Sequence, residues 1–236
     1  MSQYNDEYRK LVIKILTEGH LQDCRNGSQL IMPSASFTID NLKDDHTLLL
    51  RKTYSKGIRA EFDTIMDTET PLTNVKQFED RGCNYWKANA GPNGELNLDY
   101  YNMLHPQLEE MIAEAKADPS SRRLVVELWN YKNYLEGNLS LPVCWKGFII
   151  SIIDDTVHMT FNTRSQDLML GTQADVLLAW YFMEHICNET GYKPGSCMYV
   201  MSNIHIYTEH IENAYKLVTD RTIEDFDKPL KFQLKA

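Results

Sequence analysis

The sequence lacks the features that mark membrane, secreted and nucleic-acid-binding proteins. No uninterrupted apolar run reaches the roughly 20 residues that cross a bilayer, and the polar, acid-containing N-terminus does not have the pattern of a secretory signal. Positive charge is also scarce, because 24 Lys and Arg stand against 33 Asp and Glu and leave a net charge of −9. We therefore expect neither a membrane protein nor a dedicated nucleic-acid binder.

Cysteine pairs are missing as well. The five cysteines are odd in number and include no CxxC pair, which favours neither a disulfide framework nor a zinc site; they are Cys24, Cys83, Cys144, Cys187 and Cys197. We expect free thiols in the cytoplasm and no metal. The 236 residues, 43% of them apolar, suffice for a large core, and no linker-like segment interrupts them. The prediction is a single domain over residues 1–236.

Hydrophobic periodicity predicts both helices and strands. Helices are expected over 8–16, 48–54, 58–66, 74–81, 107–117, 176–190 and 208–218, and strands over 29–40, 124–129, 145–153, 156–163 and 199–207. Pro106 is placed in the first turn of its helix, and Asp154-Asp155 is the turn of a hairpin. Since helices and strands mix without strict alternation, we expect an α+β fold with a mixed or antiparallel sheet.

Residues 141–175 concentrate the side chains that can carry chemistry. Cys144 opens the stretch, and residues 164–175 read RSQDLMLGTQAD. Residues 118–123 read DPSSRR, and residues 205–207 read HIY. A thiol nucleophile needs a cation nearby to form a thiolate, and guanidinium groups suit phosphate oxygens. Taken singly, these residues also fit plainer roles as a buried cysteine, surface charge or a helix cap.

In this order and spacing the motifs resemble the active-site core of the thymidylate synthase family, over roughly residues 29–218. In that family a Cys before a hairpin is followed by R-S-x-D-x-x-L-G-x-x-x-N, and D-P-x-S-R-R precedes both. The motif ends here in Asp175 instead of Asn, which is similar to the deoxycytidylate hydroxymethylase branch. The resemblance implies a thymidylate synthase-like fold in which one face of the sheet forms a dimer interface.

The resemblance also implies a role for each matching residue. Cys144 is the expected nucleophile, Glu61 and Tyr100 manage protons and water, and Asp175 reads the base. The nucleotide is expected to contact Arg164, Ser165, His205 and Tyr207 of one chain and Arg122 and Arg123 of the other, which predicts a homodimer. The folate is expected to lie against Trp86, Asp167, Leu170 and Gly171.

The implied activity is deoxycytidylate 5-hydroxymethyltransferase with 5,10-methylenetetrahydrofolate as co-substrate and no metal. Cys144 would add to C6 of the cytosine, C5 would take up the one-carbon unit, and water would complete the hydroxymethyl group. The alternatives are a thymidylate synthase, a deoxycytidylate C5-methyltransferase, and an inactive nucleotide- or RNA-binding homologue. The hydroxymethylase branch suggests a bacteriophage source and host cytoplasm as the location.

Several positions depart from the family pattern. Trp145 follows the cysteine where the family usually has His, and the nearby proline is Pro142 instead of the residue directly before the thiol. Residues 34–37 lack the phosphate-binding arginine of most thymidylate synthases, which leaves a fourth phosphate contact unassigned. Asp175 has an alternative role as the cap of a helix that begins at Val176.

Overall fold

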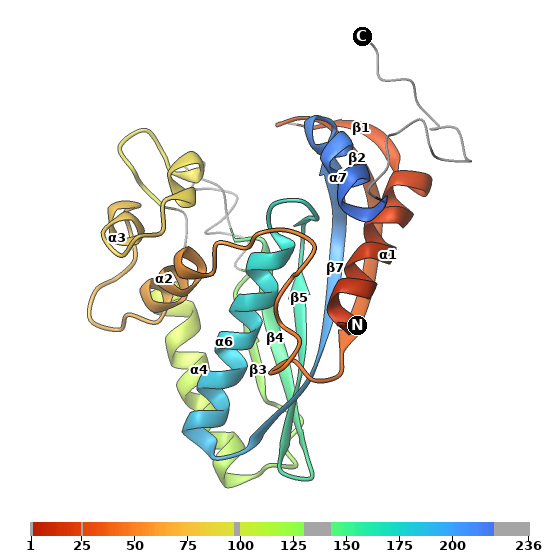
Figure 1. Ribbon diagram of the computed structural model, residues 1–236. Helices are drawn as coiled ribbons and strands as arrows, with labels where there is room; N and C mark the ends of the chain where they lie inside the picture. Colours follow the sequence, from red (N-terminus) through yellow and green to blue (C-terminus); the bar gives the residue numbers. More distant parts are fainter. Residues whose placement is uncertain (1, 25, 97–99, 130–142, 220–236) are drawn as a thin grey trace.

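The computed structural model describes residues 2–24, 26–96, 100–129 and 143–219 (Figure 1). Its first half contains α1 (Gln3–Glu18), β1 (His20–Cys24), β2 (Gly27–Ile39), α2 (Ser55–Ile65), α3 (Lys76–Glu79), the 3-10 helix η1 (Tyr85–Asn89) and α4 (Tyr100–Ala117). The second half contains β3 (Val125–Glu127), β4 (Trp145–Ile153), β5 (Thr156–Thr163), β6 (Gln166–Asp167), α6 (Thr172–Thr190), β7 (Lys193–Tyr207), η2 (Thr208–His210) and α7 (Ile211–Thr219).

One sheet runs through the molecule in the order β1-β2-β7-β5-β4-β3, and the short strand β6 also pairs with β7. The pairs β5–β7 and β6–β7 are parallel, and the other pairs are antiparallel. The prediction of an α+β fold with a mixed sheet packed by helices is therefore confirmed. Among the described residues, no helix is both long enough and apolar enough to cross a membrane.

Helices cover one face of the sheet. α4 and α6 lie beside each other over the β3–β5 half, and α1 lies along β2 (Figure 1). A row of aromatic rings on that face joins four strands to α6, with centroids 5.1 to 5.7 Å apart, from Phe37 through Tyr199, Phe161 and Trp145 to Phe182. Such spacing is favourable for aromatic pairs, so the row ties the layers together.

Strand directions bring the motif segments to one end of the sheet. β5 is antiparallel to β4 and parallel to β7, so the start of β4 and the ends of β5 and β7 share an edge (Figure 1). The predicted hairpin turn at the other end is confirmed: Asp154 and Asp155 have φ of 48° and 57°, as the type I′ turn of a two-residue hairpin requires. Residues 144, 164–175 and 205–207 therefore meet at the opposite edge.

The helix predicted over residues 48–54 is wrong, since this segment is extended and irregular. The Asn5 side chain accepts hydrogen bonds from the backbone N–H groups of Leu49 (2.6 Å) and Leu50 (3.2 Å). A tertiary contact thus satisfies two amides that would have no partner within a helix starting at residue 48. Tyr8 and Arg51 then hold the loop after β6, because the Tyr8 hydroxyl donates to the Leu168 carbonyl at 2.5 Å and Arg51 donates to the carbonyl of Met169.

Other elements are confirmed with different ends. α4 already includes Tyr100, so Pro106 lies inside the helix and its predicted place in the first turn is wrong. Burial of Tyr100 and Leu104 against the core explains this, because packing outweighs the local preference of proline. α6 begins at Thr172, and β7 is 15 residues long with a positive φ of 46° at Asn203.

Candidate active site

The thiol of Cys144 and the guanidinium of Arg164 are placed by the two ends of one hairpin. The Arg164 backbone N–H donates to the Cys144 carbonyl at 2.8 Å, and Arg164 Nε donates to the Val143 carbonyl at 2.7 Å. The guanidinium also lies over the Trp129 ring, with Cζ 5.2 Å from the centroid. The hairpin therefore brings Arg164 to Cys144.

Electrostatics around Cys144 favour the neutral thiol. Its pKa is raised to about 11, mainly by burial; Arg164 lowers it, and the carboxyl groups of Asp175, Asp167 and Glu61 contribute to the rise. These influences show that three acids and one cation surround the sulfur. Because the thiolate is the nucleophilic form, Arg164 favours reaction at Cys144 and the three acids oppose it.

Asp175 does not cap its helix. α6 begins three residues earlier, with Gly171 at the N-cap position, so the alternative role of Asp175 as the cap of a helix beginning at Val176 is wrong. The side chain instead accepts a hydrogen bond from Gln166 Nε2 at its Oδ2, at 2.7 Å. Burial raises the pKa of Asp175 to about 7, the Gln166 bond lowers it and Asp167 raises it. The carboxyl is thus held beside the thiol.

Asp167 organises the loop between β6 and α6. Its Oδ1 accepts from the backbone N–H groups of Met169 (2.8 Å) and Leu170 (3.0 Å), and its Oδ2 has no hydrogen-bond partner among the residues that the structure describes. Burial raises its pKa, whereas the hydrogen bonds from Leu170 and Met169 and the nearby His205 lower it. Leu170 is 52% exposed, and Gly171 follows it. An acceptor oxygen next to an exposed apolar side chain fits a ligand ring that carries N–H donors.

Glu61 lies in a buried polar cluster on α2. Its Oε1 accepts from Trp86 Nε1 at 2.7 Å, and its Oε2 accepts from the Tyr85 hydroxyl. Burial raises the pKa of Glu61 to about 7; the bonds from Tyr85 and Trp86 lower it, and Asp175 raises it. Trp86 stacks on Phe78 with centroids 5.4 Å apart. Sequence analysis missed Tyr85, which stands in a short 3-10 helix without periodicity.

Tyr100 is in the core and contacts Trp145, the residue that follows Cys144. It is 1% exposed, and its hydroxyl accepts from Trp145 Nε1 at 3.2 Å. The two rings stack with centroids 5.7 Å apart. Trp145, which stands where the family usually has His, therefore links Tyr100 to the start of β4.

His205 and Tyr207 share one side of β7, as expected from their i, i+2 spacing, and their rings make an edge contact at 5.1 Å. His205 Nδ1 lies 2.9 Å from the Asn203 carbonyl, and the Asn203 side chain donates to the Arg164 carbonyl at 2.9 Å. The Asn203 side chain thus joins β7 to the end of β5. Ser165, half-buried, follows Arg164 at this junction.

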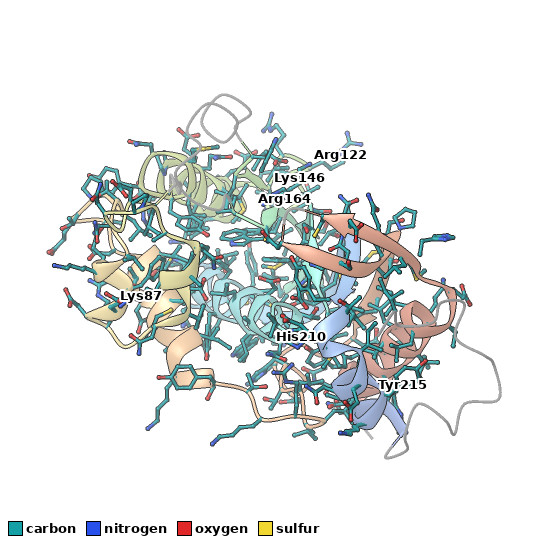
Figure 2. The ribbon with its side chains drawn as sticks, turned by 90° about the horizontal axis from the view of Figure 1, so that it is seen from above. Lys87, Arg122, Lys146, Arg164, His210 and Tyr215 are labelled. Carbon is teal, nitrogen blue, oxygen red and sulfur yellow. The ribbon has the colours of Figure 1, made fainter. Side chains whose placement is uncertain are left out.

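Arg122 and Arg123 do not join this cluster within one chain. Both are exposed, and Arg123 forms an ion pair with Glu114 at 2.6 Å. The next residue, Leu124, accepts from the Ile150 N–H, five residues beyond the start of β4, or roughly 17 Å along the strand at about 3.3 Å per residue. In the view from above, Arg122 lies on the same side of the molecule as Arg164 and Lys146 (Figure 2).

Comparison with known protein families identifies the family of this chain. The model of the family described as thymidylate synthase matches residues 6–234, which is nearly the whole chain. In that family a cysteine, phosphate-binding arginines and methylenetetrahydrofolate serve one-carbon transfer to C5 of a pyrimidine nucleotide. Within the described residues, no group of three or more His, Cys, Asp and Glu side chains is arranged to hold a metal. The chain therefore belongs to the thymidylate synthase family and is a folate-dependent one-carbon transferase.

Proposed function

We propose that this protein is a deoxycytidylate 5-hydroxymethyltransferase. The observation that carries the proposal is Asp175, an acid at the family's base-reading position, held beside Cys144 by the hydrogen bond from Gln166. Uracil presents an N3–H donor and an O4 acceptor, which an Asn amide matches. Cytosine presents an N4 amino donor and an N3 acceptor, and a carboxyl group accepts from N4 while sharing a proton with N3.

Burial makes this recognition selective. A pKa of about 7 means that Asp175 keeps a proton available near neutral pH, so the group is able both to accept and to donate. With uracil, O4 would face an acceptor oxygen, and a buried polar group without a partner costs about 1–3 kcal/mol. Sites that bind one hydrogen-bonding pattern discriminate strongly against its inverse.

Cys144 supplies covalent catalysis in this proposal. Its thiolate adds to C6 of the cytosine, and C5 then becomes nucleophilic toward the one-carbon unit. Because burial raises the thiol pKa to about 11 in one chain, we propose that the guanidinium groups gathered around the nucleotide phosphate promote thiolate formation. Arg164 contributes from the same chain, and Arg122 and Arg123 from the partner.

Bound methylenetetrahydrofolate supplies a one-carbon unit at the oxidation level of formaldehyde. Asp167 offers its unpaired Oδ2 as an acceptor for the folate ring, and Trp86, Leu170 and Gly171 provide its contact surface. Glu61, buried with Tyr85 and Trp86, positions the water that completes the hydroxymethyl group. Tyr100 acts through Trp145 at the start of β4. Ser165 contacts the phosphate, and His205 and Tyr207 contact the sugar.

The uncovered face of the sheet supports a homodimer. Val125, Ile149 and Met198 are 40%, 44% and 40% exposed and lie in one row across β3, β4 and β7, with Thr160 of β5 between the last two. Exposed apolar side chains gathered on one sheet face are characteristic of an association surface. A two-fold axis through this face carries Arg122 and Arg123 toward the site of the partner. We also propose that the chain forms one catalytic domain, since one buried cluster extends from Tyr4 to Val218. The proposed location is the cytoplasm.

Product analysis tests the function. The enzyme is incubated with methylenetetrahydrofolate and either deoxycytidylate or deoxyuridylate, and the nucleotides are analysed by mass spectrometry, with the Cys144→Ser variant as control. We expect deoxycytidylate to gain CH2O. A gain of CH2 on deoxyuridylate would identify a thymidylate synthase, a gain of CH2 on deoxycytidylate a C5-methyltransferase, and nucleotide binding without product an inactive homologue.

A further inference from the structure

We propose that Gln166 determines base selectivity by locking the orientation of the Asp175 carboxyl group. This inference rests on the proposed function and extends it to a residue of a different element. Gln166 Nε2 donates to Asp175 Oδ2 at 2.7 Å, so Oδ2 is kept as an acceptor and Oδ1 is the oxygen that carries any proton. Gln166 acts through Asp175 and is a positioning residue.

The contact joins the sheet to the helix. Gln166 is 2% exposed on β6, where it pairs with Ile204 of β7, and Asp175 lies in the first turn of α6. Gly171 leaves room for the contact, because a Cβ at this position would lie 3.3 Å from Gln166 Nε2 and 3.6 Å from Asp175 Oδ2. The buried amide, the carboxyl and the glycine thus form one rigid unit.

A carboxyl group in a fixed orientation discriminates between cytosine and uracil, whereas a freely rotating one does not. With the proton on Oδ1, Oδ1–H donates to cytosine N3, and the second lone pair of Oδ2 accepts from N4–H. Uracil placed in the same way sets N3–H against Oδ1–H and O4 against Oδ2, so both contacts are mismatched. Rotation of the carboxyl by half a turn would match uracil equally well. The bond from Gln166 opposes that rotation.

Among the described residues, no cation holds the Asp175 carboxyl group in place of the Gln166 amide. Gln166 is the one hydrogen-bond donor to the Asp175 carboxyl, and Asp175 forms no ion pair, among the residues that the structure describes. The titratable groups that interact with Asp175 come from α1, α2, the start of β4, β6 and β7, and are Tyr4, Glu61, Cys144, Asp167 and Tyr199. All are acids or weak acids, so the orientation of Asp175 depends on the neutral amide.

The test measures kcat/KM for deoxycytidylate and deoxyuridylate with the full-length dimer. Gln166→Met keeps the length of the side chain and removes the donor, and we expect the selectivity ratio to fall at least tenfold. The matched control is Gln173→Met in the first turn of α6, because Gln173 donates to the Leu170 carbonyl and not to Asp175. Its ratio is expected to equal that of the wild type.

Two further measurements separate positioning from a purely structural role. In an Asp175→Asn background, Gln166→Met is expected to change the ratio less than twofold, because Gln166 acts only through the carboxyl. Loss of the N–H donor also raises the pKa of Asp175, so the pH profile of deoxycytidylate turnover is expected to shift to higher pH. Gln166→Leu, which also removes the donor, should lose selectivity as well if the Met variant does not fold.

An unchanged ratio in a folded Gln166→Met or Gln166→Leu protein would overturn the inference while leaving the function intact. A wild-type enzyme that prefers deoxyuridylate would instead overturn the proposed function and, with it, the inference. Thermal melting shows whether each variant is folded, and the wild-type ratio shows which of the two cases applies.

Discussion

The backbone N–H of Arg164 donates to the carbonyl oxygen of Cys144 at 2.8 Å, across 20 residues of sequence. This bond closes the open end of the β4–β5 hairpin. Backbone geometry therefore holds the two residues near each other, and the bond from Arg164 Nε to the Val143 carbonyl directs the guanidinium group. Such fixed placement is what preorganised catalysis requires.

Cys144→Ser is expected to leave the fold intact, because the change is nearly isosteric, and to lower turnover at least about a thousandfold. Since burial raises the pKa of Cys144 to about 11, alkylation by iodoacetamide in the absence of nucleotide should be slow at neutral pH and accelerate up to high pH. Cys24→Ser is the control and should retain activity. Substantial activity in Cys144→Ser would mean that the reaction needs no covalent step at this residue.

Asp175→Asn is expected to shift the ratio of specificity constants toward deoxyuridylate by at least roughly tenfold, about 1.4 kcal/mol. The reason is that an amide presents one acceptor and one donor in the arrangement that uracil matches. Parallel assays with the two nucleotides measure the effect. An unchanged preference in a folded variant would remove the basis for the deoxycytidylate assignment.

A mixture of Arg123→Ala and Cys144→Ser subunits is expected to recover activity that neither variant shows alone. In a heterodimer, one site combines an intact thiol with intact arginines from the partner, whereas a single chain separates these groups by roughly 17 Å along the strand. Activity after subunit exchange, followed with differently tagged chains, measures the recovery. Confirmed exchange without recovery would show that the arginines act within their own chain.

Glu61→Gln is expected to flatten the pH dependence of stability. Burial raises the pKa of Glu61 from 4.5 to about 7, so the unfolded chain loses this proton at lower pH than the folded one. The free energy of unfolding therefore falls as pH rises from about 4.5 to 7, by roughly 3 kcal/mol for this group. Urea unfolding at pH 5 and pH 8 measures the loss.

The matched control for this experiment is Glu110→Gln, at an exposed position of α4. It should keep the wild-type pH dependence. Asp175, whose pKa burial raises in the same direction, accounts for the slope that we expect to remain in Glu61→Gln. Equal slopes in Glu61→Gln and the wild type would show that Glu61 is not buried as an acid.

Gly147→Ala is expected to destabilise the protein by about 3 kcal/mol or more. Gly147 has a φ of +146°, and a Cβ there would lie 2.0 Å from the Val126 carbonyl oxygen. Gly191→Ala is the control: its φ is +82°, but nothing lies within 4 Å of an added Cβ, so we expect a loss of about 1 kcal/mol. Thermal unfolding of both variants checks the difference, and equal losses would contradict the close strand contact at Gly147.

Tertiary contacts explain where sequence analysis failed. The segment 48–54 has an apolar pattern typical of a helix, but Asn5 binds its backbone and Arg51 reaches the loop after β6. Gln166 occupies a variable position of the R-S-x-D motif, and Tyr85 follows no pattern at all. Their contacts with Asp175 and Glu61 join residues 9 and 24 positions apart, which no local signal reveals.

The sequence by itself determined the α+β class, the β4–β5 hairpin with its Asp154-Asp155 turn, and the order of the family motifs, because these depend on local periodicity, turn chemistry and residue spacing. Only the tertiary structure decided which hydrogen bonds hold Asp175, Asp167 and Glu61, and how far burial moves their pKa values. Desolvation and distant hydrogen bonds arise when separate segments pack together, so they are properties of the folded chain and not of any single stretch of it.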